Sequence, residues 1–587
     1  MALLEVNGLK VYFDTPAGEA HAVDEVSFSV EKGDILGIVG ESGCGKSVTA
    51  MSIPRLVPTP PSRRVAGTIS FDGNELTTIS NEELRKLRGA EIGVVFQDPM
   101  TALSPLHKIG NQLIEGLRLH QKISKDEALG KAKIMLEKCG LPERCLNAYP
   151  FQLSGGQQQR AMIASTLLLE PKLIIADEPT TALDVTIQRQ ILELMKNAKQ
   201  EETAMLLITH NISIVKELCN KLIIMYAGEI VESGTAEDIF SNPRHPYTKA
   251  LLDAMPSSGA RGERLATIPG VVPSPTSYPE GCRFAPRCRF ATDACSQSHP
   301  VLEAFSSSNA SHLCRCSQTI CSADKTRLSS KATDAQASDE KSNTEEPILS
   351  VRSISKSFKH VKAVNDVTFD VKRGETFAIV GESGCGKTTL SRVIAGLLPP
   401  DNGAIYLNNI ALSPKRSKEE HRAILMIFQN PFSSLNPRMS IMNILTEGPL
   451  AHKLITKSNR EEYALDLLRA VGLPEDALHR YPNEFSGGQL QRISIARAIA
   501  MKPEIIICDE PVSALDVSVQ AQVINLLMEL QAARDITYIF ITHDISLVKR
   551  IADQVAVMKD GFIVEQGATE TIFAHPQHEF SKQLLMM

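Results

Sequence analysis

The sequence lacks any apolar run of about 18 residues, the length that a membrane-spanning helix requires. It also lacks a basic stretch followed by an apolar one after Met1, the pattern of a standard export signal. Its 62 basic and 68 acidic residues give a net charge of −6, so no general positive charge attracts nucleic acid or anionic lipid. These absences exclude a membrane-spanning chain and a broadly basic nucleic-acid binder. We expect a cytoplasmic protein whose partners are chosen by local surfaces.

The sequence contains two copies of one glycine-rich motif. Residues 40–47 (GESGCGKS) recur as residues 381–388 (GESGCGKT). The 587 residues, of which 43% are hydrophobic, are enough for about two to four globular units. Between the copies, residues 322–346 are mostly small, polar and charged, which predicts a flexible linker. The pattern indicates a tandem repeat of one unit.

Each glycine-rich motif follows a short apolar run, residues 35–39 (ILGIV) and 377–380 (FAIV). The alternation of such runs with helical stretches predicts a sheet of parallel strands covered by helices. After a buried strand, glycines let backbone amides close around phosphates, the lysine reaches the β and γ groups, and the hydroxyl ligates magnesium. A glycine-rich turn without nucleotide is the alternative, which the repetition disfavours. The predicted ATP-binding residues are Gly40, Gly43, Gly45, Lys46 and Ser47, and Gly381, Gly384, Gly386, Lys387 and Thr388.

A second apolar run in each copy ends in two acids, in residues 173–178 (LIIADE) and 505–510 (IIICDE). An aspartate at the end of a buried strand can hold magnesium, and the glutamate after it can polarise a water molecule against the γ-phosphate. Proline follows both pairs, so a helix cap is the alternative reading. The spacing predicts Asp177 and Asp509 as magnesium ligands and Glu178 and Glu510 as catalytic residues.

Two further segments, residues 153–157 (LSGGQ) and 485–489 (FSGGQ), each precede an amphipathic stretch. A serine and two glycines at a helix start offer a hydroxyl, open amides and a positive dipole end to a terminal phosphate. With these motifs, residues 1–255 and 347–587 resemble ABC-type ATPase domains. The resemblance implies an α/β fold with two P-loop ABC ATPase domains in tandem, each with a mixed sheet core and a helical subdomain. Residues 256–321 then form a small Cys-rich extension of the first domain.

The family resemblance also implies roles for residues outside the glycine-rich motifs. His210 and His543 match the switch histidines that contact the γ-phosphate, although a lone histidine at a strand end is more often a loop residue. Phe13 and Phe358 match an aromatic that stacks on adenine, although each could belong to the core. The Q-loop glutamines, which contact magnesium, are Gln97 and Gln429. The signature residues are Ser154, Gly155, Gly156 and Gln157, with Ser486, Gly487, Gly488 and Gln489.

In the family, the signature of one domain acts on the ATP held by the other. The resemblance therefore implies that the two domains pair within one chain and form two composite sites. Ser486 and Gly488 would complete the site of Lys46, while Ser154 and Gly156 would complete that of Lys387. Neither set of residues is degenerate, so we expect both sites to hydrolyse ATP.

Segments beyond the shared motifs indicate the branch of the family. Residues 430–437 (NPFSSLNP), and more loosely residues 98–105, resemble the part of peptide and nickel importer ATPases that faces the coupling helices of the permeases. Residues 245–252 (HPYTKALL) resemble the start of the extension in oligopeptide and dipeptide ATPases. The resemblance implies an ATPase that powers peptide import from the cytoplasmic face of the inner membrane, as a peripheral subunit. Its partners would be two transmembrane permease subunits and, indirectly, an external solute-binding protein.

Other functions stay open at this point. Nickel complexes, glutathione or another small solute are alternative cargoes, because the ATPases that serve them look similar. A soluble tandem ATPase acting on ribosomes or DNA is a further alternative. The linker at 322–346 disfavours it, because this segment has mixed charge and no helical apolar stripe. We therefore expect no nucleic-acid partner.

Six of the twelve cysteines lie between residues 282 and 321. In a reducing cytoplasm such a cluster indicates metal binding rather than disulfides. Residues 281–314 resemble the part of the family's extension that is associated with a four-iron, four-sulfur cluster. The resemblance implies a [4Fe–4S] cofactor, besides ATP and Mg²⁺, on Cys282, Cys288, Cys295 and Cys314. Zinc, which also takes four cysteines, and unligated thiols stay open.

Overall fold

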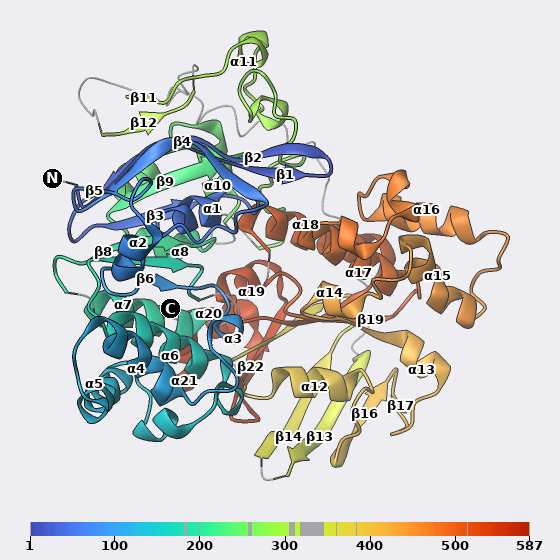
Figure 1. The fold of residues 1–587 in the computed structure, drawn as a ribbon. Helices are drawn as coiled ribbons and strands as arrows, with labels where there is room; N and C mark the ends of the chain where they lie inside the picture. Colours follow the sequence, from blue (N-terminus) through green and yellow to red (C-terminus); the bar gives the residue numbers. More distant parts are fainter. Residues whose placement is uncertain are drawn as a thin grey trace. The chain divides into compact units, whose positions relative to one another are not determined.

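The structure is a computed structural model that describes residues 2–180, 185–198, 200–255, 261–304, 311–316, 346–359, 361–382, 384–513 and 515–585 (Figure 1). The chain forms two compact units. Residues 1–183, 187–253 and 268–331 make the first unit, and residues 184–186, 254–267 and 332–587 make the second. Apart from residue 346, the predicted linker lies outside the described residues. None of the described helices combines the length and apolarity needed to cross a lipid bilayer. The domain boundaries drawn from the sequence stay a prediction.

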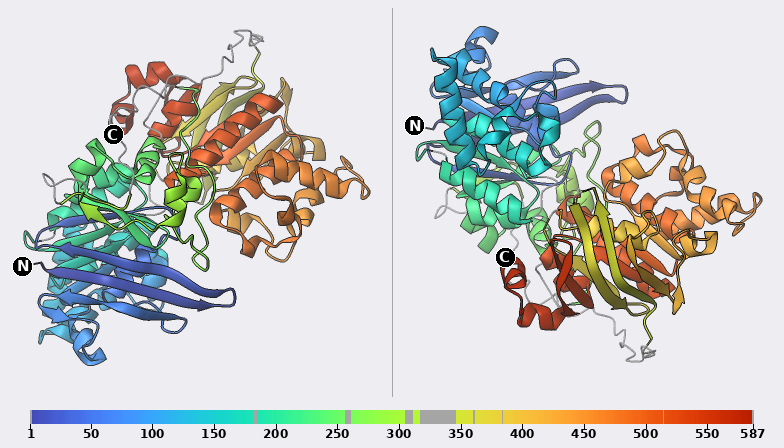
Figure 2. Two further views of the ribbon diagram at one scale, coloured as in Figure 1. Left: turned by 90° about the horizontal axis from the view of Figure 1, so that it is seen from above. Right: turned by 90° about the horizontal axis from the view of Figure 1, so that it is seen from below.

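Each unit contains a small antiparallel sheet built on a long hairpin. The strand order is β2-β1-β4-β5 in the first unit and β14-β13-β16-β17 in the second. Both views in Figure 2 show the paired hairpin strands running side by side, β1 with β2 and β13 with β14. The strands are β1 (Leu4–Thr15), β2 (Gly18–Val30), β4 (Ser62–Phe71), β5 (Asn74–Glu75), β13 (Leu349–Phe358), β14 (Val361–Val371), β16 (Asn402–Leu407) and β17 (Ile410–Ala411).

A larger sheet in each unit carries the glycine-rich loop on an inner strand. Its order is β11-β12-β10-β9-β3-β8-β7-β6 in the first unit and β18-β19-β20-β15-β21-β22 in the second. The strands of the first are β3 (Ile35–Val39), β6 (Ile92–Val95), β7 (Leu173–Asp177), β8 (Ala204–Ile208), β9 (Lys221–Tyr226), β10 (Glu229–Thr235), β11 (Glu303–Ala304) and β12 (Leu313–Cys314). Those of the second are β15 (Thr376–Val380), β18 (Ile424–Ile427), β19 (Ile505–Asp509), β20 (Thr537–Ile541), β21 (Gln554–Lys559) and β22 (Phe562–Ala568).

The predicted α/β class with a mixed sheet core is found in both units. Strands β3, β7 and β8, like β15, β19 and β20, are buried at every residue, which is typical of parallel strands covered on both faces. The described strands pair antiparallel toward one edge of each large sheet, at β9–β10, β10–β12 and β11–β12 in the first unit and at β21–β22 in the second. Because the inner strands are parallel, their carboxyl ends meet at one edge of each sheet, and the residues that follow them gather there.

Helices cover the large sheets and build a separate helical layer in each unit. In the first unit α4, α5 and α6 contact one another, and in the second α15 and α16 both contact α17 (Figure 1). These six helices are α4 (Ile109–His120), α5 (Lys125–Lys138), α6 (Gly155–Leu167), α15 (Ile441–Ala451), α16 (Arg460–Ala470) and α17 (Gly487–Ile499). Each unit thus has the helical subdomain expected from the sequence.

The remaining helices connect and cover the strands of each unit. In the first unit they are α1 (Lys46–Ser52), α2 (Asn81–Leu87), α3 (Pro99–Ala102), α7 (Val185–Ala198), α8 (Ile212–Leu218), α9 (Ala236–Ser241), α10 (Pro246–Asp253) and α11 (Asp293–Gln297). In the second they are α12 (Lys387–Ile394), α13 (Lys418–Ala423), α14 (Pro431–Ser434), α18 (Val517–Arg534), α19 (Ile545–Ile551), α20 (Thr569–Ala574) and α21 (Glu579–Leu585).

The Cys-rich extension is attached to the large sheet of the first unit. Its strand β12 pairs with β10, with Cys314 opposite Glu232, and β11 pairs with β12. Its described residues also include a 3₁₀ turn (Ala285–Arg287) and the short helix α11, and most of the others have no regular secondary structure. The extension therefore continues the sheet that carries the glycine-rich loop of the first unit.

Residues 254–267, which follow α10, belong by their contacts to the second unit. The side chain of Leu265 is only 3% exposed and lies in the core cluster of that unit. Its backbone N–H donates to the side-chain oxygen of Asn525 on α18 at 2.9 Å, and its carbonyl accepts from the Asn525 amide at 2.8 Å. These two hydrogen bonds satisfy both the oxygen and the nitrogen of the buried Asn525 amide, so they hold residues 254–267 firmly in the second unit.

Candidate functional site

Both glycine-rich loops have the same geometry. In the first, Lys46 begins α1 and its ammonium donates to the carbonyls of Gly40 and Glu41 at 2.9 and 3.0 Å. In the second, Lys387 donates to the corresponding carbonyls of Gly381 and Glu382, both at 2.8 Å. Each lysine is buried inside its own loop. A phosphate group in the loop would offer these ammonium groups a charged acceptor in place of neutral carbonyls.

Close packing requires glycine just before each lysine. Gly45 and Gly386 precede the helices with φ of 97° and 107° in the left-handed region. A Cβ atom on Gly386 would lie 2.0 Å from the carbonyl oxygen of Ala363, and one on Gly45 would lie 2.3 Å from that of Ala22. Any side chain would collide with backbone of the neighbouring hairpin, so the loop can take this path only with glycine.

The hydroxyl and the aspartate predicted to hold magnesium lie together in both units. The Ser47 hydroxyl donates to Asp177 at 2.9 Å, and the Thr388 hydroxyl donates to Asp509 at 3.3 Å. Burial raises the pKa of Asp177 above its ordinary value, and that of Asp509 to about 6, with the adjacent glutamate adding to both. A bound cation would offset the unfavourable burial of these ionised carboxylates. An oxygen-only set with few protein ligands suits Mg²⁺, which keeps waters and phosphate oxygens in its shell.

Glutamine, glutamate and histidine converge at the end of each acidic strand. The Gln97 amide donates to Glu178 at 2.8 Å, and Nδ1 of His210 lies 3.6 Å from the same carboxylate. These three residues follow β6, β7 and β8, three neighbouring strands.

The second unit repeats this arrangement. The Gln429 amide donates to Glu510 at 2.7 Å, and Nδ1 of His543 lies 3.3 Å from Glu510. Burial opposes both charges, yet the contact outweighs it and raises the pKa of His543 while lowering that of Glu510. The pair is thus an ionised carboxylate with a histidine biased toward its charged form.

Both glutamates have a backbone conformation that the sequence did not reveal. Their φ values are 46° for Glu178 and 47° for Glu510, in the left-handed region that non-glycine residues rarely adopt. Their N–H groups donate to Ile208 and Ile541, at 2.9 Å in each case, which pins the turn. Such strain costs roughly 1–3 kcal/mol and persists only where the surrounding contacts enforce it.

The two signature segments begin helices as predicted. The Ser154 hydroxyl caps α6 by accepting from the Gln157 N–H, and the Gln157 side chain accepts from the Ser154 N–H. Ser486 and Gln489 form the same capping box on α17. Among the described residues, a Cβ on Gly155 would meet nothing within 4 Å and one on Gly487 would meet a single atom, at 3.8 Å, so these residues leave both helix starts open. Gly156 and Gly488 occupy the next position of each helix.

The two predicted adenine-stacking aromatics differ in exposure. Phe358 is 46% exposed, with the Lys356 ammonium 5.9 Å from its ring centre. Phe13 is partly buried and packs against the first core cluster. Its neighbour Tyr12 stacks on His21 and donates to Asp24, so the tyrosine ring is already engaged. Phe358 has the more accessible ring of the two.

Two family models match the chain. The model described as ABC transporter matches residues 23–181 and 364–513, which covers more than half of the sequence, including both glycine-rich loops, both Q-loop glutamines and both pairs of acids. This chain belongs to the ABC transporter family. The second model, described as the C-terminal region of oligopeptide/dipeptide transporters, matches residues 231–295. As an ABC-type ATPase, the chain hydrolyses ATP, as the sequence motifs predicted.

Curated ABC transporter relatives match nearly the whole chain. The oligopeptide transport ATP-binding proteins OppD of Mycobacterium tuberculosis and Mycobacterium bovis are each 40% identical over 608 residues, covering 99% of this chain and 98% of the relative. The glutathione import ATP-binding protein GsiA of Escherichia coli (strain K12) is 39% identical over 611 residues, covering 99% of this chain and 89% of the relative. Among solved structures, cbiO1 from Clostridium perfringens is 30% identical with a TM-score of 0.37, covering 39% of this chain and 92% of that one.

Proposed function

We propose that this chain is the ATP-hydrolysing subunit of an importer of dipeptides or oligopeptides, bound peripherally at the cytoplasmic face of the inner membrane. The observation that carries the proposal is the complete set of site residues in both units, with Glu178 and Glu510 each held by a glutamine and a histidine. The matched oligopeptide transporter region and the similarity to OppD support peptide as the cargo. The similarity to GsiA makes glutathione the second candidate.

Three groups of residues, present in both units, have separate tasks in the proposed mechanism. Lys46 and Lys387 transfer their hydrogen bonds from loop carbonyls to the β- and γ-phosphates. Ser47 with Asp177, and Thr388 with Asp509, would hold magnesium, which would supply positive charge to neutralise the phosphates. Glu178 and Glu510 orient a water molecule for attack and accept its proton.

Gln97 and Gln429 hold these glutamates in place, while His210 and His543 lie beside them and would contact the γ-phosphate. We further propose that each ATP is completed by the signature of the other domain. The open helix starts at Ser154 and Ser486 support this, because their amides and dipoles suit a terminal phosphate. ATP would then close the two domains, and hydrolysis would reopen them.

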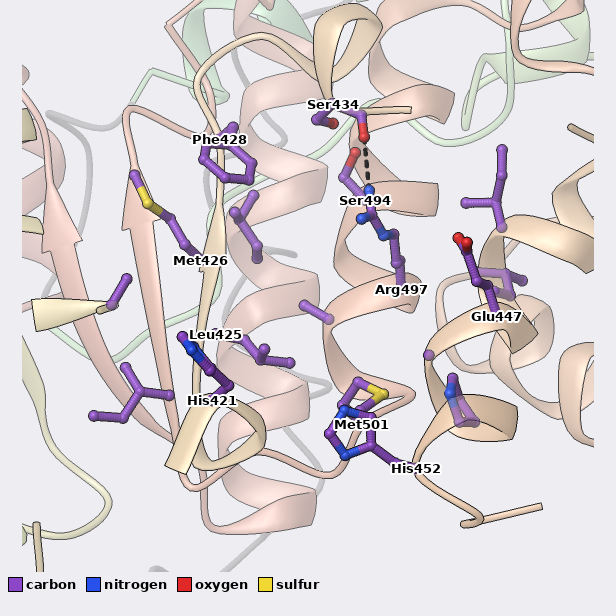
Figure 3. Close-up of a pocket in the computed structure, with 18 of the residues that line it drawn as sticks. His421, Leu425, Met426, Phe428, Ser434, Glu447, His452, Ser494, Arg497 and Met501 are labelled. Carbon is purple, nitrogen blue, oxygen red and sulfur yellow. Dashed lines mark hydrogen bonds between the residues drawn. The ribbon is translucent and has the colours of Figure 1, made fainter. Parts of the chain in front are cut away.

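A cavity beside the second Q-loop is the proposed docking place for a permease. It has a volume of about 470 Å³ and lies between β18, α15 and α17 (Figure 3). Phe428, the residue before Gln429, lines it, together with Met426. The Ser494 hydroxyl inside it has no hydrogen-bond partner among the described residues. The lining is mostly apolar and also includes Glu447, His452 and Arg497. Such a cavity fits a short cytoplasmic helix of a permease, and the adjacent Q-loop would carry its movement to Glu510.

Filling this cavity is expected to uncouple transport from hydrolysis. Ala451 is exposed on α15 and lines the cavity, so Ala451→Trp should block docking without disturbing the core. We expect basal ATP turnover to stay within about twofold of wild type while cargo uptake falls by about tenfold or more. Ala533→Trp, at an exposed alanine of α18 that does not line the cavity, is the matched control. Normal uptake with Ala451→Trp would contradict this docking place.

Uptake measurements test the transport function. Cells that lack this chain would be supplied with labelled dipeptides, longer peptides, glutathione or nickel, with and without a plasmid that carries the wild-type chain. Loss of peptide uptake that the wild type restores would support the proposal. Loss of glutathione uptake alone would replace peptide by the second candidate. If no uptake is lost, the result would favour the alternative of a soluble ATPase. An ATPase rate that depends on ribosomes or DNA would establish that alternative.

We also propose that the extension binds a [4Fe–4S] cluster through Cys282, Cys288, Cys295 and Cys314. The Cys282 N–H donates to the Cys295 carbonyl at 2.8 Å. Burial raises the pKa of the Cys282, Cys288 and Cys314 thiols, and neighbouring cysteines raise it further, so the thiols lie within electrostatic reach of one another. In the described part of the chain no three such side chains are arranged around a metal position, so binding requires them to draw together. Cys316 lies within the same reach and is a further candidate ligand.

Metal analysis decides between the candidate cofactors. Protein purified without oxygen is expected to be brown and to contain about four iron and four sulfide ions per chain. Cys288→Ser should lose both, whereas Cys139→Ser, at a buried cysteine of the first unit outside the extension, should keep them. Colourless protein with one zinc ion per chain would replace the cluster by a structural zinc site. Protein that contains no metal would show that the cysteines are unligated thiols.

A further inference from the structure

The first glycine-rich loop is held by a contact that has no counterpart among the described residues of the second. Glu41 lies in this loop, and each of its polar groups is engaged. Its N–H donates to the Tyr247 hydroxyl at 3.0 Å, and its carbonyl accepts from Lys46 at 3.0 Å. Its carboxylate is bound by both terminal nitrogens of Arg287, at 2.6 and 3.1 Å. The side chains of Arg287 and Glu41 are only 3% and 4% exposed, so this two-pronged ion pair is buried.

Arg287 comes from the Cys-rich extension, 246 residues after Glu41. It ends the 3₁₀ turn Ala285–Arg287, directly before Cys288. Its Nε donates to the Pro269 carbonyl at 2.8 Å, which fixes the guanidinium in position. Phe284 packs edge-on against Tyr226 and Tyr247, with ring centres 5.2 and 5.4 Å apart. The extension therefore contributes an arginine that binds the phosphate loop and a phenylalanine that packs against two tyrosines, one of which also contacts this loop.

The second copy supplies an internal comparison. The N–H of Tyr247 donates to Nδ1 of His245 at 3.1 Å, and that of Phe580 donates to Nδ1 of His578 at the same distance, so Phe580 occupies the tyrosine's place without its hydroxyl. The last residue of β21 is Lys559, where β9 ends in Tyr226. Glu382, the counterpart of Glu41, is exposed. The two loops thus share their ATP-binding residues and differ in this contact.

We propose that the Cys-rich extension sets the nucleotide affinity of the first loop through Arg287, so that the two ATP sites are unequal and the first holds ATP more tightly. Two physical effects act in the same direction. The Arg287 ion pair and the Tyr247 hydrogen bond order the loop before ATP arrives, which lowers the entropy cost of binding. Arg287 also neutralises a carboxylate that would otherwise repel the phosphates. Arg287 is a positioning residue here, because it acts on ATP through Glu41. The proposal rests on ATP binding at residues 40–47 and goes beyond it.

Site-specific binding measurements test the proposal. Lys387→Ala removes binding at the second loop, so titration of that full-length chain with a fluorescent ATP analogue reports the first loop alone, and Lys46→Ala reports the second. Adding Arg287→Ala should raise the Kd of the first loop by about tenfold or more and leave the second within about twofold. Arg289→Ala, at an exposed arginine of the same extension, should change neither.

Two further variants separate positioning from misfolding. Tyr247→Phe gives the first loop the residue that the second already has, and it should weaken ATP binding in the same direction by a smaller factor. Arg287→Lys keeps the charge and should recover part of the lost affinity. Two outcomes would overturn the proposal. One is that both loops have equal Kd values for ATP when the extension carries no substitution. The other is that the Kd of the first loop stays unchanged in both Arg287→Ala and Tyr247→Phe. If neither loop binds ATP at all, the function proposed above fails instead.

Discussion

Replacing Glu178 and Glu510 together by glutamine is expected to reduce ATP turnover by about 10²–10⁴-fold, the range that a general base contributes, while ATP still binds. Glutamine keeps the size of the side chain and an oxygen that can accept from Gln97 or Gln429, so the geometry survives. It cannot accept a proton from the attacking water. Steady-state hydrolysis measures the expected loss of turnover, and nucleotide binding on the same preparation checks that ATP still binds.

The controls for this double variant follow from the repeated site. Each single variant removes one base and leaves the other unit's set complete, so it should keep measurable turnover if both sites hydrolyse ATP. Glu193→Gln, at a carboxylate of α7 with its side chain 54% exposed, tests for general effects of losing one charge. Turnover near the wild-type rate in the double variant would rule out both glutamates as the base.

Gly386→Ala is expected to abolish ATP binding at the second site, with a loss of at least about 100-fold. The new Cβ would lie 2.0 Å from the Ala363 carbonyl oxygen and would also face a φ of 107°. The hairpin backbone cannot yield by that much, so the loop has to move and its amides leave the phosphate position. Nucleotide titration in the Lys46→Ala background measures the effect on this site alone.

Gly73→Ala is the matched control for the loop variant. Gly73 has a φ of 80°, also in the left-handed region, yet a Cβ there meets none of the described residues within 4 Å. It should cost only the backbone strain, about 1 kcal/mol of stability, and leave ATP binding unchanged. Equal ATP affinity in Gly386→Ala and wild type would show that the close approach to Ala363 is unimportant for the loop.

Features that depend on neighbouring residues could be predicted from the sequence. The strands Ile35–Val39 and Leu173–Asp177 lie where the apolar runs placed them, and Ser154 caps its helix as its position before two glycines indicated. Gln97 and His210 meet Glu178 because parallel strands bring their carboxyl ends together. The family resemblance had assigned the glutamine to magnesium and the histidine to the γ-phosphate, and it did not predict these contacts with Glu178. The order of strands in the sheet then determines these contacts.

Features that depend on distant or strained contacts could not be predicted. The residues around Glu41 do not predict its ion pair with Arg287, because an ion pair between residues so distant in the sequence leaves no local pattern. The left-handed φ of Glu178 and Glu510 runs against the preference of glutamate, and only the surrounding sheet enforces it. The cysteine spacing likewise fixes neither which four thiols approach one another nor the metal they would hold.

The packing of Leu265 bears on how this polypeptide can be divided. A cut at the sequence boundaries, after residue 255 and before residue 347, would produce a second half without the leucine that completes its own interior. Asn525 would then face an empty slot with two unsatisfied amide groups, a defect that costs about 1–3 kcal/mol for each group. The second half is therefore expected to be less stable without residues 254–267. A split gene, an expression fragment or a domain exchange has to carry residues 254–267 along with it.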